Sequence, residues 1–222
     1  MKIENIKACV FDAYGTLFDV NSAAAKCKEK LGSKWEGFAN AWRTTQLEYT
    51  WLRSLMKKHK NFWEITEDSL DHTMETFKIK KEMRNELLDL YKKLSPYPEV
   101  EECLKGLKNK KIKIAILSNG TPDLLKGLVE SNNIQNYFDD ILSIESVGIY
   151  KPDSRVYEMP IKKYNCAPEN ICFMSSNTWD ISGGGIFGYN AVWVNRQNKV
   201  FDRLSYKPKY VIGNLEELLK II

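Results

Sequence analysis

Residues 10–19 read Val10-Phe11-Asp12-Ala13-Tyr14-Gly15-Thr16-Leu17-Phe18-Asp19, and this stretch decides the fold. It ends an apolar strand in a carboxylate and then turns at once through Tyr14, Gly15 and Thr16. Such a turn would present Asp12 as an exposed nucleophile. Taken alone, the stretch is also compatible with an ordinary first strand followed by a helix-capping aspartate, because single short motifs are weak signals.

The residue two places after Asp12 is as informative as Asp12 itself. The stretch resembles the first motif of the haloacid dehalogenase superfamily, whose phosphatase branch has a second acid at this position to protonate a leaving alkoxide. Here the position is Tyr14, and a phenol with a pKa of about 10 is a poor acid at neutral pH. A halide leaves without a proton, so the tyrosine favours a halide as the leaving group.

The composition is that of a globular protein with one sizeable core, or with a core domain that carries a smaller inserted one. The chain has 222 residues, of which 43% are hydrophobic and 28% charged. The net charge of +4 is modest and the lysine clusters contain few aromatic residues, so we expect no nucleic-acid partner. The five cysteines include no C-x-x-C pair, which argues against a zinc site or a disulfide framework.

No segment approaches the roughly 20 apolar residues of a membrane span, and the first apolar run is too short for a signal peptide. We therefore expect a cytoplasmic protein without a membrane partner.

Short apolar runs alternate with helical patterns, which predicts an α/β fold with a parallel sheet flanked by helices. The predicted strands are residues 8–11, 112–117, 141–144, 171–174 and 191–195. Polar residues follow several of these strands. Because the carboxyl ends of parallel strands line one crevice, these residues should converge there: Asp12, Ser118-Asn119, Ser175-Ser176-Asn177 and Asn195-Arg196.

The stretch from Val20 to about Tyr97 has only helical patterns, which predicts an inserted helical cap. We assign residues 1–20 and 97–222 to the core and residues 21–96 to an all-helical cap subdomain. Pro96-Tyr97-Pro98 marks the return to the core.

A long cap helix is predicted over about residues 35–58, with apolar residues on two opposite faces. One stripe contains Phe38, Trp42, Tyr49, Leu52 and Met56, and the other contains Leu47, Trp51 and Leu55. One of these faces needs a cover, which could be a second copy of the chain or the rest of the same chain. Arg43 lies on neither stripe and is a candidate for reaching into the crevice, although a surface arginine is the default interpretation.

Later segments supply further candidates. Ser118 and Asn119 follow a strand and start a turn with free backbone N–H groups, which is an anion site or simply a helix cap. Lys151 precedes Pro152-Asp153, where a helix should begin, and a fixed cation near Asp12 would keep that carboxylate charged. Ser176 stands where magnesium-dependent phosphatases of the superfamily have an acid, which disfavours a metal site.

These segments together resemble the L-2-haloacid dehalogenase family over nearly the whole chain. The resemblance includes the cap stretch from Trp42 to Met56 and the stretch from Ser175 to Asp180. It implies a Rossmann-like core with a helical cap, no metal or other cofactor, and a homodimer built on cap helices. It also implies hydrolysis of short L-2-haloalkanoic acids to D-2-hydroxy acids.

In the mechanism that the resemblance implies, Asp12 attacks the α-carbon of the substrate and expels halide with inversion. The substrate becomes an ester of Asp12. The halide would be bound by the guanidinium of Arg43, the side-chain amide of Asn119 and the ring edge of Trp179. Ser118 would bind the substrate carboxylate.

A water activated by Asp180 would then hydrolyse the ester, and Lys151 would steady both carboxylates. Phe62 would belong to the apolar wall around the alkyl group. Hydroxyl and amide groups at the supporting positions would orient the nucleophile and the water: Tyr14, Thr16, Tyr157, Ser175 and Asn177.

Two departures from the family pattern stand out. Gly183-Gly184-Gly185 occupies a helix where each extra glycine costs about 0.5 to 1 kcal/mol, so the end of the site near Asp180 should be looser. Pro160 should kink its helix. Two other functions remain open at this stage: a small-molecule phosphatase of the same superfamily, and a non-catalytic dimeric scaffold that has only kept the fold.

Overall fold

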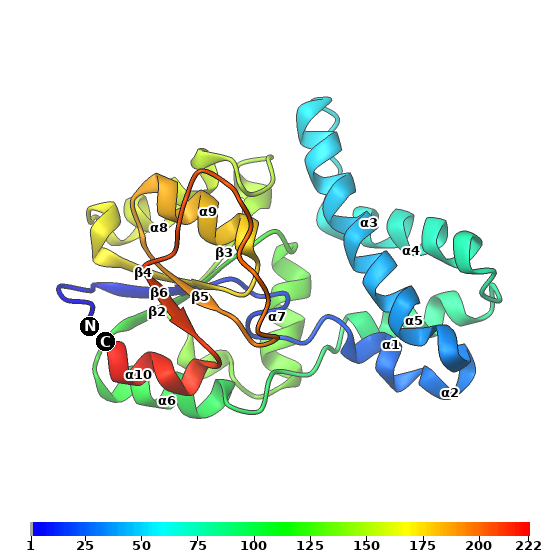
Figure 1. The fold of residues 1–222 in the computed structure, drawn as a ribbon, viewed down its shortest axis with the longest axis horizontal. Coiled ribbons are helices and arrows are strands. Elements are labelled where there is room, and N and C mark those ends of the chain that lie inside the picture. Colours follow the sequence, from blue (N-terminus) through cyan, green and yellow to red (C-terminus); the bar gives the residue numbers. More distant parts are fainter. Residues whose placement is uncertain (1) are drawn as a thin grey trace.

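The computed structural model describes residues 2–222 and contains a six-stranded, fully parallel sheet in the order β3-β2-β1-β4-β5-β6 (Figure 1). The strands are β1 (Ala8–Phe11), β2 (Lys113–Ser118), β3 (Asp140–Ser143), β4 (Ile171–Ser175), β5 (Asn190–Val194) and β6 (Tyr210–Ile212). The predicted α/β class and its five strands are confirmed, with ends shifted by at most one residue. The edge strand β6 was missed, because three residues are too few to show a periodic pattern.

Strand β1 lies in the middle of the sheet, and all of its residues are buried. It pairs with β2 on one side, Val10 opposite Ala115, and with β4 on the other, Val10 opposite Phe173. The strand order reverses at β1, and in such sheets the ligand crevice lies at the carboxyl ends beside the reversal. Asp12 directly follows β1 and therefore stands at the mouth of this crevice.

The sheet is flanked by helices α6 (Val100–Asn109), α7 (Pro122–Ser131), α8 (Ser154–Tyr164), α9 (Thr178–Phe187) and α10 (Leu218–Ile221). Figure 1 shows α8 and α9 on one side of the sheet and α6 and α10 on the other. Helix α8 has Asp153 as its N-cap, as predicted, and continues through Pro160 to Tyr164. The proline therefore does not end the helix.

The predicted helical cap is present as a separate body at the right of Figure 1. It contains α1 (Ser22–Lys26), α2 (Lys28–Leu31), α3 (Trp35–Leu55), α4 (Phe62–Phe77) and α5 (Met83–Tyr91). The two chain crossings between cap and core are joined by backbone hydrogen bonds, from Asp19 N to Ser95 O at 2.9 Å and from Tyr97 N to Leu17 O at 3.0 Å. The two segments thus form a double-stranded hinge.

The long helix α3 ends at Leu55, about three residues earlier than predicted. Its first half packs inside the cap, where Trp42 Nε1 donates to Thr66 O of α4 at 3.1 Å. At its end three large apolar side chains are exposed: Leu52, Leu55 and Met56, by 50%, 80% and 60%. None of the helices within residues 2–222 combines the length and apolar composition that a bilayer crossing requires.

Candidate active site

The centre of the site is a buried ammonium group between two carboxylates. Lys151 Nζ lies 2.9 Å from Asp180 Oδ2 and 3.3 Å from Asp12 Oδ1, and its side chain is 0% exposed. Asp12 comes from the end of β1, Asp180 from the first turn of α9, and Lys151 from the loop before α8. Three segments that are far apart in sequence therefore meet, and Lys151 lies beside Asp12, as expected from the sequence for a fixed cation.

The two oxygens of Asp12 have different surroundings. Oδ2 accepts three hydrogen bonds, from Asn177 Nδ2 at 2.8 Å, Thr16 Oγ1 at 3.0 Å and Ser175 Oγ at 3.4 Å. Within residues 2–222, the one hydrogen bond to Oδ1 comes from Lys151 Nζ. Oδ2 is thus fixed in place by its donors, while Oδ1 keeps free lone pairs. Asn177 Nδ2 also donates to Tyr14 O at 3.2 Å, so the side-chain hydrogen bonds of Asn177 go to Asp12 and Tyr14, whereas its contact with Asp180 is a backbone one, from Asp180 N to Asn177 O at 3.1 Å.

Both oxygens of Asp180 are also occupied. Oδ2 pairs with Lys151, and Oδ1 accepts the hydroxyl of Tyr157 at 2.7 Å. Burial raises the pKa of Asp180 to about 6, although the ammonium of Lys151 opposes this rise. Burial beside Asp180 also raises the pKa of Tyr157, so this hydroxyl stays protonated and donates to the carboxylate.

The three glycines of α9 allow this close packing. A Cβ at Gly183 would lie 2.5 Å from Tyr157 Oη, one at Gly184 2.8 Å from the Phe173 ring, and one at Gly185 2.2 Å from the Tyr206 ring. A methyl group at any of them would push an aromatic ring aside. The glycines lower helix propensity, but they let α9 approach its neighbours, which the sequence pattern did not indicate.

Ser118 is the last residue of β2 and Asn119 follows it directly. Asn119 Oδ1 accepts Lys151 N at 3.2 Å, so its amide nitrogen is the end left for a ligand. Ser118 Oγ accepts Gly120 N at 3.1 Å and is fully buried. Gly120 in turn lies against the Tyr14 ring, where a Cβ would come within 2.8 Å of Tyr14 Cε2.

Arg43 reaches the site from α3 of the cap. It donates to Tyr14 O of the core at 3.4 Å and to Gln46 Oε1 at 2.9 Å. Gln46 is buried and is itself held by Thr66 Oγ1 at 2.7 Å and Tyr91 Oη at 3.0 Å. Gln46 therefore fixes the direction of the guanidinium, a role that the sequence alone did not reveal.

The apolar part of the site is built from rings of both bodies. Phe62 of α4 is fully buried and packs against Tyr14, with ring centroids 5.0 Å apart. The hydroxyl of Tyr14 is buried and has no hydrogen-bond partner among residues 2–222, and burial raises its pKa well above 10. Tyr14 thus behaves as an apolar ring and, as expected from the sequence, not as an acid.

A contact missed in the sequence fastens the cap to the core beside Phe62. Glu145, just after β3, accepts Phe62 N at 3.2 Å through Oε1, and its Oε2 lies 3.0 Å from His59 Nε2. Tyr150 Oη donates to Lys60 O at 2.7 Å. We call the set His59, Lys60, Phe62, Glu145 and Tyr150 the latch. Its partners are more than 80 residues apart, so no local pattern could indicate them.

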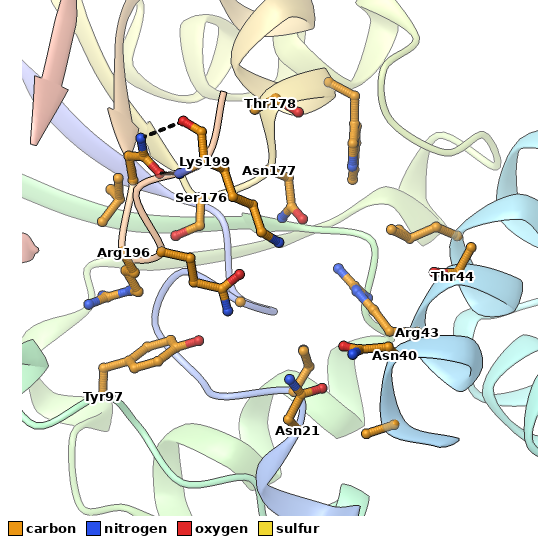
Figure 2. Close-up of a pocket in the computed structure, with 18 of the residues that line it drawn as sticks. Asn21, Asn40, Arg43, Thr44, Tyr97, Ser176, Asn177, Thr178, Arg196 and Lys199 are labelled. Carbon is orange, nitrogen blue, oxygen red and sulfur yellow. Dashed lines mark hydrogen bonds between the residues drawn. The ribbon is translucent and has the colours of Figure 1, made fainter. Parts of the chain in front are cut away.

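Trp179, at the start of α9, packs edge-on against Trp51 of the cap, with ring centroids 5.4 Å apart. Beside it a cleft opens between α3 and the loops that follow β4 and β5, with a volume of about 730 Å³ (Figure 2). Arg43, Asn177 and Trp179 line this cleft, whereas Asp12 and Lys151 do not. Asn177 also donates to Asp12 Oδ2, so the cleft lies next to the buried carboxylates.

The groups around Asp12 are a poor donor set for magnesium. The ammonium of Lys151 already lies between the two carboxylates that would ligate a metal, and Ser176 contributes only a hydroxyl. Ser176 Oγ is buried without a hydrogen-bond partner in the described chain. Within residues 2–222, no group of three or more His, Cys, Asp or Glu side chains is arranged to hold a metal ion.

Comparison with known proteins agrees with this geometry. The family model of the haloacid dehalogenase-like hydrolases matches residues 6–188. (S)-2-haloacid dehalogenase 1 of Pseudomonas sp. (strain CBS-3) is 40% identical over 222 residues, which cover 99% of this chain and 98% of the relative.

Solved structures give the same result. A dehalogenase crystal structure matches with a TM-score of 0.97 and 36% identity, covering 99% of this chain and 98% of its own. The L-2-haloacid dehalogenase of Xanthobacter autotrophicus, solved with chloropropionic acid covalently bound, matches with a TM-score of 0.90 and 31% identity, covering 97% of both chains. The chain therefore belongs to the haloacid dehalogenase-like hydrolases and, among them, to the family of the (S)-2-haloacid dehalogenases.

Proposed function

We propose that this protein hydrolyses short L-2-haloalkanoic acids to D-2-hydroxy acids, without a metal and through an ester of Asp12. The observation that carries the proposal is the buried ammonium of Lys151 between Asp12 and Asp180. It provides one carboxylate to attack carbon and a second one to activate water, and a fixed cation holds both in place.

In the first step Asp12 Oδ1 attacks the α-carbon of the substrate from the side opposite the halogen. The new C–O bond forms as the carbon–halogen bond breaks, and the halide leaves with the bonding electron pair. Oδ1 is the attacking oxygen because Oδ2 is engaged by Thr16, Ser175 and Asn177. The leaving halide meets N–H donors and an aromatic edge from Arg43, Asn119 and Trp179.

The substrate carboxylate is held near Ser118 and the backbone N–H groups at the start of the β2–α7 turn. The alkyl group lies against Phe62 and Tyr14, whose rings are in contact. This apolar wall limits the size of the alkyl group on that side of the site.

In the second step Asp180 accepts a proton from water, and the resulting hydroxide attacks the ester carbonyl carbon of Asp12. The bond between that carbon and the ester oxygen then breaks, and the leaving alkoxide takes the proton back from Asp180 and departs as the D-2-hydroxy acid. Asp12 returns to a carboxylate by losing the proton of the added hydroxyl. With a pKa of about 6, Asp180 is ionised at neutral pH and basic enough to take the proton. Tyr157 and Lys151 hold it in position.

The names of the relatives support this assignment, since several of them are (S)-2-haloacid dehalogenases and one is a haloacetate dehalogenase. The alternatives have less support. A phosphatase would lack its second acid at Tyr14 and a carboxylate at Ser176, and a scaffold would have no reason to keep the paired charges around Lys151.

The test is chloride release from L-2-chloropropionate in the presence of a chelator. We expect turnover that added magnesium does not increase, and single-turnover mass spectrometry should find a carboxyethyl group on the peptide that contains Asp12. The Asp12→Asn protein should show neither. Magnesium-dependent phosphate release from a small ester, with no chloride release, would identify a phosphatase instead.

We also propose that the protein is a cytoplasmic homodimer. Leu52, Leu55 and Met56 at the end of α3 form an exposed apolar face that a second cap would cover. We propose residues 21–96 as the cap and residues 1–20 and 97–222 as the core, since the paired crossings at Asp19–Ser95 and Leu17–Tyr97 lie beside these bounds. Leu55→Lys should shift the sedimentation of a dimer to that of a monomer.

A further inference from the structure

The cleft beside the catalytic carboxylates is positively charged. Its charged lining residues are Glu36, Arg43, Arg196 and Lys199. Arg196 is neutralised by an ion pair with Glu99, and its guanidinium stacks 3.8 Å above the centre of the Tyr97 ring. Arg43 and Lys199 have no carboxylate within ion-pair distance in the part of the chain that the structure describes.

Lys199 is directed into this cleft by the loop after β5. Asn195 holds its backbone on both sides: Asn195 Oδ1 accepts Lys199 N at 2.8 Å, and Asn195 Nδ2 donates to Lys199 O at 3.0 Å. Figure 2 shows the side chain of Lys199 pointing inward from one wall, and the guanidinium of Arg43 pointing inward from the opposite wall.

The N-terminus of α9 also lies at the cleft, where the carboxylate of Asp202 accepts a hydrogen bond from Thr178 Oγ1 and offsets part of the positive potential of the helix end. Thr178 and Trp179 line the cleft at the N-terminus of this ten-residue helix, where the helix dipole favours an anion. Two free cations and a helix N-terminus therefore face the same space, and Glu36 is the one acid among the cleft-lining residues.

We infer that this cleft is an anion-binding subsite next to the active site, in which Lys199 recognises a second carboxylate on the substrate. The inference rests on the proposed dehalogenation. In that reaction the α-carboxylate is bound near Ser118 and the halide near Arg43, so a monocarboxylic substrate leaves Lys199 without an anionic partner. In a 2-haloacid with a terminal carboxylate, the end of the chain would turn away from the Phe62–Tyr14 wall and pass Asn177 and Trp179 into the cleft, whose volume of about 730 Å³ has room for it.

The substrate class is therefore L-2-halogenated dicarboxylic acids. We would measure kcat/KM for L-2-chlorosuccinate, L-2-chloroglutarate and L-2-chloropropionate, in the native protein and in Lys199→Gln. For the better dicarboxylate, the ratio of its kcat/KM to that of chloropropionate should fall by about two- to fivefold in Lys199→Gln, as expected for losing one charge pair at an exposed lysine. Salt at 0.5 M should lower the same ratio in the native protein.

Two matched variants separate a specific role from a general charge effect. Lys199→Arg keeps the cation and should keep the ratio within about twofold of native. Lys207→Gln removes an exposed lysine that does not line the cleft, and should leave the ratio unchanged.

A ratio that is unchanged in Lys199→Gln, or reduced as much in Lys207→Gln, would overturn the inference while the dehalogenase assignment stands. The same holds if the native protein turns over chloropropionate and neither dicarboxylate. If chloropropionate itself is not turned over, the proposed function fails. The anion-binding subsite is then tested by calorimetry of binding. Succinate should bind more tightly than propionate to the native protein, and this difference in affinity should be absent in Lys199→Gln.

Discussion

The core half and the cap half of the site are held by interactions of very different strength. In the core, Lys151 and its two carboxylates are buried, and every oxygen of Asp12 and Asp180 has a partner. In the cap, Arg43 reaches the core through one hydrogen bond of 3.4 Å, and Phe62 is fixed through the latch. The core half is thus held by buried charges, whereas the cap half is held by single hydrogen bonds and ring contacts.

The largest effect should come from breaking the core half. Lys151→Met removes the only cation between two buried carboxylates, so we expect kcat to fall by at least about 10³-fold and the free energy of unfolding to fall by about 3–5 kcal/mol. Chloride release and urea denaturation measure the two losses. Lys207→Met, at an exposed position, should change neither. Native-like stability in Lys151→Met would refute the stabilising role of these buried charges.

Asp180→Asn should leave the attack by Asp12 intact and stop ester hydrolysis. We expect kcat to fall about 10³-fold while the protein accumulates the ester, which intact-mass measurement would detect. A variant that turns over without accumulating ester would assign water activation to another group.

The pH dependence follows from the same carboxylate. Burial raises its pKa from 3.8 to about 6, so the folded state binds a proton more readily than the unfolded chain. Asp180 therefore stabilises the folded state below about pH 4, and this contribution is lost as the pH rises through 6. The difference in the free energy of unfolding between the native protein and Asp180→Asn should fall over the same pH range. The rate should instead rise with pH over this range, because only the ionised form accepts a proton. Thermal melts and rates measured over the same pH range test both expectations, the fall in stability and the rise in rate.

In the cap half, Arg43→Gln should lower kcat/KM about 10²-fold, because it removes a charged donor to the leaving halide. Stability should change by no more than about 1 kcal/mol, since Arg43 forms no ion pair with a residue in the range 2–222. Equal losses of stability in Arg43→Gln and Lys151→Met would remove the distinction between the two halves.

Gly183→Ala probes the packing that positions Tyr157 against Asp180. Its Cβ would lie 2.5 Å from Tyr157 Oη, so we expect about a tenfold loss of kcat and about 1–3 kcal/mol of stability. Gly127→Ala in α7 is the matched control, because a Cβ there meets nothing within 4 Å. That change should be neutral or stabilising by up to about 1 kcal/mol.

The smallest effect should come from the latch. Glu145→Gln removes the charge facing His59 and weakens the hold on Phe62 N, so KM should rise a few-fold while kcat changes little. Steady-state kinetics over a range of alkyl chain lengths measures this. A fall in kcat with KM unchanged would mean that the latch acts on the chemical steps and not on closure.

Much of the core half could be predicted from the sequence. Asp12, Asn119 and Asn177 each follow an apolar strand, and the carboxyl ends of parallel strands must meet at one edge. Lys151 was expected near Asp12 from its place before the helix start at Pro152-Asp153, whereas the halide-binding role expected for Arg43 came from the family resemblance. The structure brings both side chains to Asp12 or its loop.

The contacts between distant segments could not be predicted. His59 and Glu145 are 86 positions apart, and the partners Glu99 and Arg196 are 97 apart. Neither pair has a local pattern, and each acid could have paired with any nearby lysine or arginine. The close approach of Gly183 to Tyr157 could not be predicted either. From the sequence alone, a glycine in a helix indicates only a lower helix propensity, and its packing role appears once the position of Tyr157 is known.

The sequence by itself determined five of the six strands, the presence of a helical cap after the first strand, and the polar residues that stand at the strand ends. These properties follow from local periodicity and turn chemistry, which act over a few residues. The tertiary structure alone decided that Oδ1 of Asp12 is the free oxygen, that the latch closes one side of the cap, and that Lys199 faces an open cleft on the other. Such properties depend on the distances between segments far apart in the chain, and only the packing of cap against core sets those distances.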